Sequence, residues 1–187
     1  MLIDIRLLEI GGFGAAVETL RLPYGKECRS TFLFNHKIKG ENLISTESCV
    51  FLNDKDIQLM QSLIRKGDEH AKFARLIQVW VNITAPRYFY QELVTYEVGV
   101  TKGCSDSTMH QECKGMSEAE LVEFKDKLPE GTMQTRTYMF SYQALRRIYF
   151  QRLGHRLPHW RCFCDWIESL PYAKELIICE ESEVNND

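Results

Sequence analysis

Residues 67–110 read GDEHAKFARLIQVWVNITAPRYFYQELVTYEVGVTKGCSDSTMH, and this stretch carries most of what the sequence predicts about the fold. FARLIQVWVNI, residues 73–83, is rich in branched and aromatic residues, which predicts a strand that is buried on both faces. PRYFYQELVTYEV, residues 86–98, predicts a helix with its proline in the first turn. TKGCSDSTMHQECKG, residues 101–115, predicts a polar loop. Most of the polar groups that could act chemically lie at the junctions of these elements.

Further helices are predicted on both sides of this stretch. NDKDIQLMQSLIRKG, residues 53–67, begins with capping residues, places apolar side chains on one face and ends at a glycine. MSEAELVEFKDKL, residues 116–128, has Ser117 and Glu120 at the spacing of a capping box. QTRTYMFSYQALRRIYFQRLG, residues 134–154, has aromatic and aliphatic residues at helical spacing and predicts one long helix. LPHWRCFCDWIESL and YAKELII predict two more helices before the end of the chain.

The N-terminal part of the chain contains strand and helix patterns in turn. LIDIRLLEI, residues 2–10, predicts a strand, and AAVETLRL after a group of glycines predicts a helix. A hairpin is predicted with strands at residues 31–34 and 49–52. We expect residues 1–180 to form a single domain and the acidic residues 181–187 to be disordered.

Composition limits the classes of protein that the chain can belong to. The chain has 187 residues and a net charge of -3, so its overall charge gives no reason to expect a nucleic-acid partner. No stretch approaches the roughly 18–20 apolar residues of a membrane span, and the N-terminus lacks the layout of a signal peptide. We therefore expect an intracellular protein without a membrane partner. Seven cysteines without regular spacing indicate reduced thiols rather than a disulfide framework.

Two groups of cysteine and histidine residues stand close together in the sequence, but neither predicts a site. His155, His159, Cys162 and Cys164 lie within ten residues of one another. On one helix the two histidines would share a face, but the two cysteines would point about 160° away from each other at 3.6 residues per turn. One helix therefore cannot present all four side chains to a tetrahedral metal, and no metal site is predicted. The second group, around Cys104, has no third residue that would orient a catalytic base.

A third group of polar residues is typical of an anion-binding site. Glu69 and His70 stand between a predicted helix end and the strand that enters the core. Arg87 and Glu92 come from the following helix, hydroxyl groups come from the polar loop, and Arg146 comes from a cationic helix face. Arginine and hydroxyl donors are the groups that hold a phosphate in many proteins. The alternative is a solvated helix face beside an ordinary loop, and the residues alone leave both interpretations open.

The central residues resemble a known family. LIRKGDEHAKFARLIQVWVNITAPRYFYQELVTYEVG, residues 63–99, is similar to the core of the flavin-dependent thymidylate synthases (ThyX), and Glu69, His70 and Phe73 match the family's EHxxF element. The resemblance covers residues 54–170 and is closest to a divergent branch found among phages and their Firmicutes hosts. It implies an α+β fold, with a central antiparallel or mixed sheet and a helical layer. It also implies a homo-oligomer (dimer or tetramer), and we expect the protein in the cytoplasm of a bacterial host cell.

The chain departs from the family's arginine-rich signature, RHRxxSxNExSxR. The first two arginines of this pattern fall on Thr95 and Glu97, the histidine between them on Tyr96, and the last arginine on Ser107, so that only Ser105 is matched. Replacing arginine by glutamate reverses the sign of a Coulomb term of about 4 kcal/mol at 4 Å and an effective dielectric constant near 20. The resemblance thus makes FAD a candidate cofactor, while the loss of the arginines argues against it.

Two hypotheses of different classes follow. The first is a diverged ThyX-like enzyme that binds a pyrimidine nucleotide or a related phosphorylated ligand and carries out a modified flavin-dependent alkyl transfer. Its general base would be Glu92 or Glu97, which requires a pKa raised by burial. Its predicted ligand-binding residues are Glu69, His70, Arg87, Tyr96, Ser105, Ser107 and Arg146. The second hypothesis is a non-catalytic, phage-type oligomeric protein that sequesters a nucleotide or binds a protein partner.

Overall fold

The computed structural model describes residues 2–25, 31–39 and 42–179 of the chain. Its centre is a four-stranded sheet in the order β1-β4-β6-β5, in which every neighbouring pair of strands is antiparallel. The strands are β1 (Asp4–Gly11), β4 (Gln78–Pro86), β5 (Val100–Ser105) and β6 (Met133–Ser141). The predicted α+β class and central antiparallel sheet are therefore confirmed.

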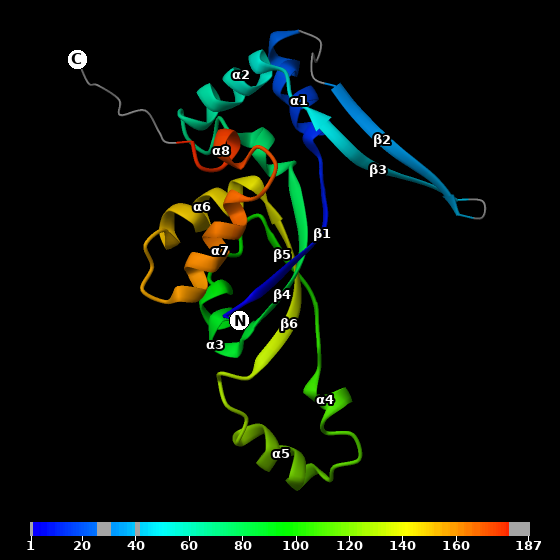
Figure 1. Cartoon of the computed structure of the whole chain (residues 1–187), viewed down its shortest axis with the longest axis vertical. Helices are drawn as coiled ribbons and strands as arrows, with labels where there is room; N and C mark the ends of the chain where they lie inside the picture. The colour runs from blue at the N-terminus through cyan, green and yellow to red at the C-terminus, as the bar shows by residue number, and fades with distance from the viewer. Residues whose placement is uncertain (1, 26–30, 40–41, 180–187) are drawn as a thin grey trace.

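Helices form a layer on one side of this sheet, as Figure 1 shows. The layer consists of α3 (Arg87–Leu93), α6 (Tyr142–Arg152), α7 (Pro158–Glu168) and the short α8 (Ala173–Leu176). Side chains of β4 and β6 alternate toward the layer, so Val81, Ile83 and Phe140 are fully buried. They pack in one cluster with the fully buried Ile148 and Phe163. Burial of this apolar surface from the sheet and the helices is the main force that holds the two layers together.

The remaining N-terminal elements pack at one end of the sheet. They are α1 (Phe13–Arg21), the 3-10 helix η1 (Leu22–Tyr24), α2 (Asp54–Ile64) and the 3-10 helix η2 (Lys72–Arg75). Asn53 caps α2 as predicted, because its side chain accepts a hydrogen bond from the Lys55 N–H at 3.0 Å. Arg21 ties α1 to α2 through its Nε, which donates to Oδ1 of the buried Asp56 at 2.7 Å. The predicted hairpin is confirmed but longer, as β2 (Thr31–Lys39) and β3 (Asn42–Phe51) pair in a separate two-stranded sheet.

A second extension lies at the other end of the sheet. It connects β5 to β6, contains α4 (Thr108–Gln111) and α5 (Glu118–Asp126), and lies below the helical layer in Figure 1. We call residues 106–132 the arm. The capping box predicted for α5 is present, since the Ser117 N–H donates to the Glu120 carboxylate at 2.8 Å and the Glu120 N–H reaches the Ser117 hydroxyl.

Three sequence predictions were wrong in their extent or type. Residues 134–141 form β6 and not the start of a helix, because α6 begins only at Tyr142. Residues 101–105 lie in the edge strand β5 and not in a loop. The strand predicted at residues 73–83 begins only with β4 at Gln78, so residues 73–77 precede it. It is also not buried on both faces: its helix side is fully buried, whereas the side chains on the other side, such as Trp80, are partly exposed. The predicted acidic tail, residues 181–187, lies outside the described residues.

Candidate functional site

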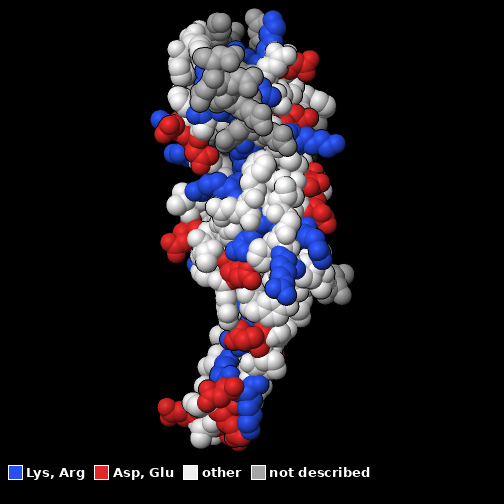
Figure 2. All heavy atoms as spheres, turned by 90° about the vertical axis from the view of Figure 1, so that its left-hand side faces the viewer, with Lys and Arg blue, Asp and Glu red and all other residues white. Residues whose placement is uncertain are grey.

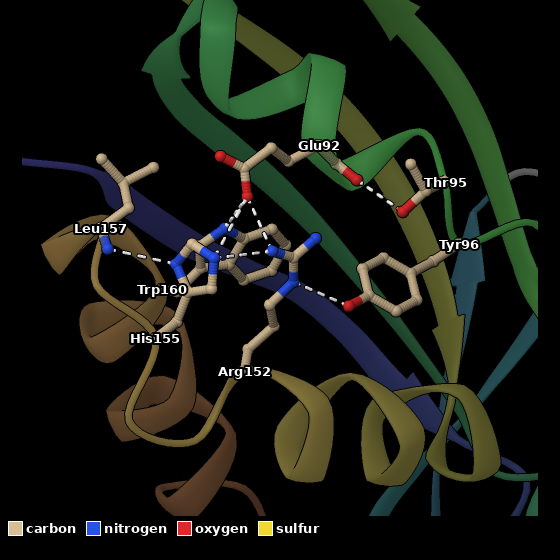
Figure 3. A network of polar contacts seen from close by, with 7 residues as sticks. All are labelled: Glu92, Thr95, Tyr96, Arg152, His155, Leu157 and Trp160. Carbon is tan, nitrogen blue, oxygen red and sulfur yellow. Dashed lines mark hydrogen bonds and ion pairs between the residues drawn. The ribbon is translucent and has the colours of Figure 1, made fainter.

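Glu92 is the centre of a polar network between three helices (Figure 3). Its Oε2 accepts a hydrogen bond from Arg152 Nη1 at 2.7 Å and one from Trp160 Nε1 at 2.8 Å. The guanidinium of Arg152 lies over the Trp160 ring at 4.2 Å, and its Nε donates to the Tyr96 hydroxyl at 2.7 Å. His155 Nε2 lies 3.7 Å from the same Glu92 oxygen. These contacts tie the end of α3 to α6 and α7, and they occupy the carboxylate that the sequence proposed as a base.

A polar pocket lies where the arm meets the body of the protein. Its volume is about 300 Å³, and it opens between the start of α3, the start of β6 and the arm. Three basic side chains and two acidic side chains line it, which leaves an excess of one positive charge. The lining residues are Arg87, Asp106, Thr108, Glu112, Lys125, Leu128, Thr132, Met133, Gln134 and Arg136. We call it the arm pocket.

Neighbouring groups hold the basic side chains of the arm pocket in place. The guanidinium of Arg136 lies 4.2 Å from the centre of the Tyr90 ring, and its Nη2 donates to Gln134 Oε1 at 2.8 Å. Burial raises the pKa of Tyr90, so its hydroxyl remains protonated and donates to the Gln134 carbonyl at 2.8 Å. Lys125 donates to the Thr108 hydroxyl, and Arg87 Nη2 lies 3.7 Å from the Glu130 carboxylate. The pocket therefore presents cations at a fixed position.

One acidic side chain fixes the base of the arm beside this pocket. Asp106 Oδ2 accepts the Thr135 N–H at 2.9 Å, and the Asp106 carbonyl accepts from Gln134 Nε2 at 3.0 Å. Ser105 and Ser107 flank Asp106 in the chain, and Ser107 Oγ lies 3.1 Å from His110 Nδ1. The two predicted serines thus stand next to the pocket, although neither lines it.

A second, smaller pocket holds the residues that replace the family's signature. Its volume is about 220 Å³, and Arg147 closes one side by donating from Nη2 to the Val98 carbonyl at 2.6 Å. Tyr96 and Glu97 line it together with Thr95, Val98, Ala144, Arg147 and Gln151. A glutamate carboxylate therefore stands where the family pattern places an arginine.

The predicted ligand-binding residues do not form one cluster. Glu69 and His70 lie exposed in the turn after α2, before β4 begins, whereas Arg87 follows β4 at its other end. A strand of nine residues spans roughly 30 Å, so it separates the two groups. Arg146 is 8% exposed and donates from Nη1 to the carbonyls of Ile177 and Cys179, both at 2.6 Å. These bonds give Arg146 a structural role in fixing the end of α8, and they do not support its predicted contact with a ligand.

Two basic residues of the arm pocket were missed in the sequence. Lys125 belongs to α5 and Arg136 to β6, and neither stands in the stretch of residues 67–110. The signal for Arg136 was the alternation of QTRTYMF, which places residues 136, 138 and 140 on one face of a strand. No local sequence pattern indicates that Lys125 lines the pocket, because its place there depends on how the arm folds back.

Within residues 2–25, 31–39 and 42–179, no group of three or more His, Cys, Asp or Glu side chains is placed to hold a metal ion. No helix in these residues is long and apolar enough to cross a membrane.

Comparison with known proteins identifies the fold. No family model matches the chain, and no curated protein matches it. ThyX from Helicobacter pylori, solved with FAD and dUMP, is similar with a TM-score of 0.63 and 11% identity, over 94% of this chain and 97% of that one. A UMP/dUMP methylase, PolB from Streptomyces cacaoi, bound with 5-Br dUMP, gives a TM-score of 0.58 and 11% identity, over 94% of each chain. The chain therefore has the fold of the flavin-dependent thymidylate synthases, as the resemblance of residues 54–170 predicted.

Proposed function

We propose that the protein binds a pyrimidine nucleotide or a related phosphorylated ligand, with the phosphate in the arm pocket. The observation that carries this proposal is the convergence of Arg87, Lys125 and Arg136 on one pocket of about 300 Å³. Guanidinium and ammonium groups are the usual partners of phosphate, and the hydroxyls of Thr108 and Thr132 add further donors. The pocket lies at the lower end of the roughly 300–1,000 Å³ range of small-molecule sites, which suits a mononucleotide.

The similar structures support the choice of a pyrimidine nucleotide. The Helicobacter pylori enzyme was solved with dUMP, and the Streptomyces cacaoi protein is a UMP/dUMP methylase bound with 5-Br dUMP. Because both are only 11% identical to this chain, their ligands indicate a class of ligand and not the residues that bind it. Ser105 and Ser107, beside the arm pocket, remain proposed donors to that ligand.

The residues that replace the signature do not fit FAD. A flavin dinucleotide carries two phosphates, but the charge of Glu97 offsets that of Arg147, which supplies the positive charge in the second pocket, and Thr95 adds none. That pocket, at about 220 Å³, is also below the range of small-molecule sites. We therefore derive no step through a flavin, and we propose binding rather than flavin-dependent alkyl transfer.

Sequestration of the nucleotide is the second candidate, and the contacts of Glu92 favour it. A general base must reach the proton that it removes, but Glu92 Oε2 already accepts from Arg152 and Trp160. Glu97 is exposed and has no hydrogen bond from its side chain to the described residues. If wild type and Glu92→Gln both bind dUMP without converting it, the function is sequestration. If wild type converts dUMP and Glu92→Gln does not, Glu92 acts as a general base.

A thermal-shift panel tests the proposed ligand class. The panel uses dUMP, UMP, inorganic phosphate and FAD with wild type, Arg87→Gln and Lys125→Gln. A ligand at about a hundred times its dissociation constant stabilises the folded state by about 2.7 kcal/mol, which raises the unfolding temperature measurably. We expect dUMP or UMP to stabilise wild type and to stabilise each variant by about half as much or less, while FAD has no effect.

Lys127→Gln is the matched control for this panel. Lys127 follows α5 two residues after Lys125, is exposed and pairs with Glu123 without lining the arm pocket. It should keep the response of wild type to dUMP. If no nucleotide stabilises wild type, or if Arg87→Gln and Lys125→Gln respond as strongly as Lys127→Gln does, the proposed site is wrong.

A further inference from the structure

Helix α5 in the arm is covered only in part, because Leu121 and Phe124 are half-buried while Ala119 and Val122 are exposed. It has nine residues, Glu118–Asp126, and none of them is buried. A helix of this length is marginal in water, because nucleation is costly and most helical stability in proteins comes from packing an apolar face. Val122 nevertheless exposes 54% of its surface, and Met116 just before the helix exposes 38%. The chain described in this structure supplies no partner that buries α5.

The exposed side of α5 has an apolar centre and an acidic rim. A shallow, open groove runs along it, with Ala119 and Val122 as its apolar residues. Ser117, Glu118, Glu123, Asp126 and Lys127 complete its lining. The arm as a whole, residues 106–132, contains seven acidic and three basic residues, a net charge of -4. Its partner should therefore combine an apolar residue with a surplus of positive charge.

The same chain carries a surface with these properties where α6 turns into α7. Residues 146–161 contain five arginines and no acidic residue. Two of them, Arg156 and Arg161, are exposed and have no ion pair or hydrogen bond from their side chains within the part of the chain that the structure describes. Leu153, at the turn, exposes 57% of its surface. We call Leu153, Arg156 and Arg161 the α6–α7 corner.

The arm and the α6–α7 corner of one chain are separated. Figure 1 shows α5 at the foot of the molecule and the turn between α6 and α7 at the outer edge of the helical layer. Figure 2 shows the corresponding face, on which both signs of charge occur, with Lys and Arg more prominent over its middle and Asp and Glu more prominent on its foot. The two complementary surfaces can meet only between chains.

We propose that a second copy of this chain docks its α6–α7 corner on the groove of α5. In a two-fold dimer the contact occurs twice, since each copy offers one arm and one corner. Arg156 and Arg161 then face the acidic rim formed by Glu123 and Asp126, while Leu153 covers Val122. This contact is then an interface of the homo-oligomer that the resemblance to the ThyX family implies.

Docking also fixes one wall of the arm pocket. The arm contributes Thr108, Glu112 and Lys125 to that pocket, so a partner that holds α5 keeps these side chains in position. The association itself does not depend on nucleotide binding, so it can be tested in the absence of any ligand.

Charge reversal tests the contact by its symmetry. One variant carries Glu123→Lys and Asp126→Lys, a second carries Arg156→Glu and Arg161→Glu, and a third carries all four changes. Lysine near the end of α5 suits the helix dipole, so the arm variant should keep its helix, which circular dichroism confirms. The mass of each variant is measured by light scattering after gel filtration over a range of concentrations. The control variant carries Lys66→Glu and Lys174→Glu, which change exposed residues at the other end of the molecule.

The expected result is loss and rescue of association. Each double variant raises the dissociation constant at least about tenfold, because attraction becomes repulsion, whereas the variant with four changes regains the mass of wild type. Hydrogen exchange of the wild type provides a measurement that needs no substitution: residues 118–126 and 153–161 should both become more protected as the concentration rises. A single chain at every concentration, unchanged mass in the double variants, or no rescue in the third variant would overturn the proposal.

Discussion

Glu92 stabilises the contact between three helices with one carboxylate oxygen. Replacing it by glutamine keeps an acceptor but removes the negative charge opposite Arg152, whose side chain is only 15% exposed. Hydrogen bonds to charged groups contribute about 1.5–3 kcal/mol against about 1 kcal/mol for neutral ones. We therefore expect Glu92→Gln to lower the free energy of unfolding by about 1–2 kcal/mol in urea titrations.

Glu97→Gln is the matched control, because it makes the same chemical change at an exposed carboxylate five residues away. Its free energy of unfolding should stay within about 0.5 kcal/mol of wild type. Equal effects of the two substitutions would show that the network around Glu92 contributes nothing specific to stability.

His159 gives the fold a dependence on pH. Its side chain is 5% exposed, its Nε2 lies 3.1 Å from the Tyr88 hydroxyl, and its Nδ1 has no partner among the described residues. Burial lowers the pKa of His159, which the charge of Glu92 opposes only in part. The unfolded chain therefore binds more protons than the folded protein once the pH falls below about 6.5.

Stability should consequently decrease on acidification. We expect the free energy of unfolding to fall from about pH 7 to about pH 5, with a shallower decrease in His159→Gln, which does not titrate there. Urea titrations at several pH values measure this slope. His70→Gln, at an exposed position, should keep the slope of wild type, and an identical slope in His159→Gln would refute the assignment.

Secondary-structure elements differ in how far the sequence predicts them. Tyr138, Tyr142 and Leu145 stand at helical spacing and predict a helix through β6, although Tyr138 and Phe140 also alternate as a buried strand requires. Ser141 decides the boundary, since its hydroxyl accepts the Ala144 N–H at 3.1 Å and starts α6. β5 has no apolar alternation at all, because it is an exposed edge strand held by backbone bonds to β6. Local pattern cannot reveal such a strand.

The two serine caps allow a test of how independently the arm folds. Ser117 caps α5 in the unburied arm, whereas Ser141 caps α6 in the core. Loss of a cap costs about 1 kcal/mol. Ser117→Ala should therefore accelerate hydrogen exchange within α5 but leave the global free energy of unfolding nearly unchanged.

Ser141→Ala provides the contrast. Its cost should appear in the global unfolding of the protein, since α6 packs in the core with Leu145 and Ile148 fully buried. If Ser117→Ala lowers the global free energy of unfolding as much as Ser141→Ala does, the arm folds as one unit with the body of the protein. That outcome would contradict the description of α5 as an element without buried residues.

At the scale of the whole molecule, the sequence predicted the family of folds but not the site. The EHxxF element and the strand after it lie close together in the sequence, so their resemblance to the ThyX family is visible without the structure. The arm pocket instead combines the start of α3, the arm and the start of β6, so its lining residues are spread from Arg87 to Arg136. Arg87 was found because it stands in the central stretch, while Lys125 and Arg136 depend on how distant segments meet.

Calorimetric titration of dUMP and UMP into wild type and Arg87→Gln measures directly whether the arm pocket holds the phosphate of a nucleotide. Arg65→Gln, an exposed arginine at the end of α2, serves as the control for the loss of one charge. If the arm pocket holds the phosphate, wild type and Arg65→Gln bind one of the nucleotides with equal affinity, and Arg87→Gln binds it at least about tenfold more weakly. The absence of binding to wild type, or equal affinities in all three proteins, would contradict a nucleotide site in this pocket.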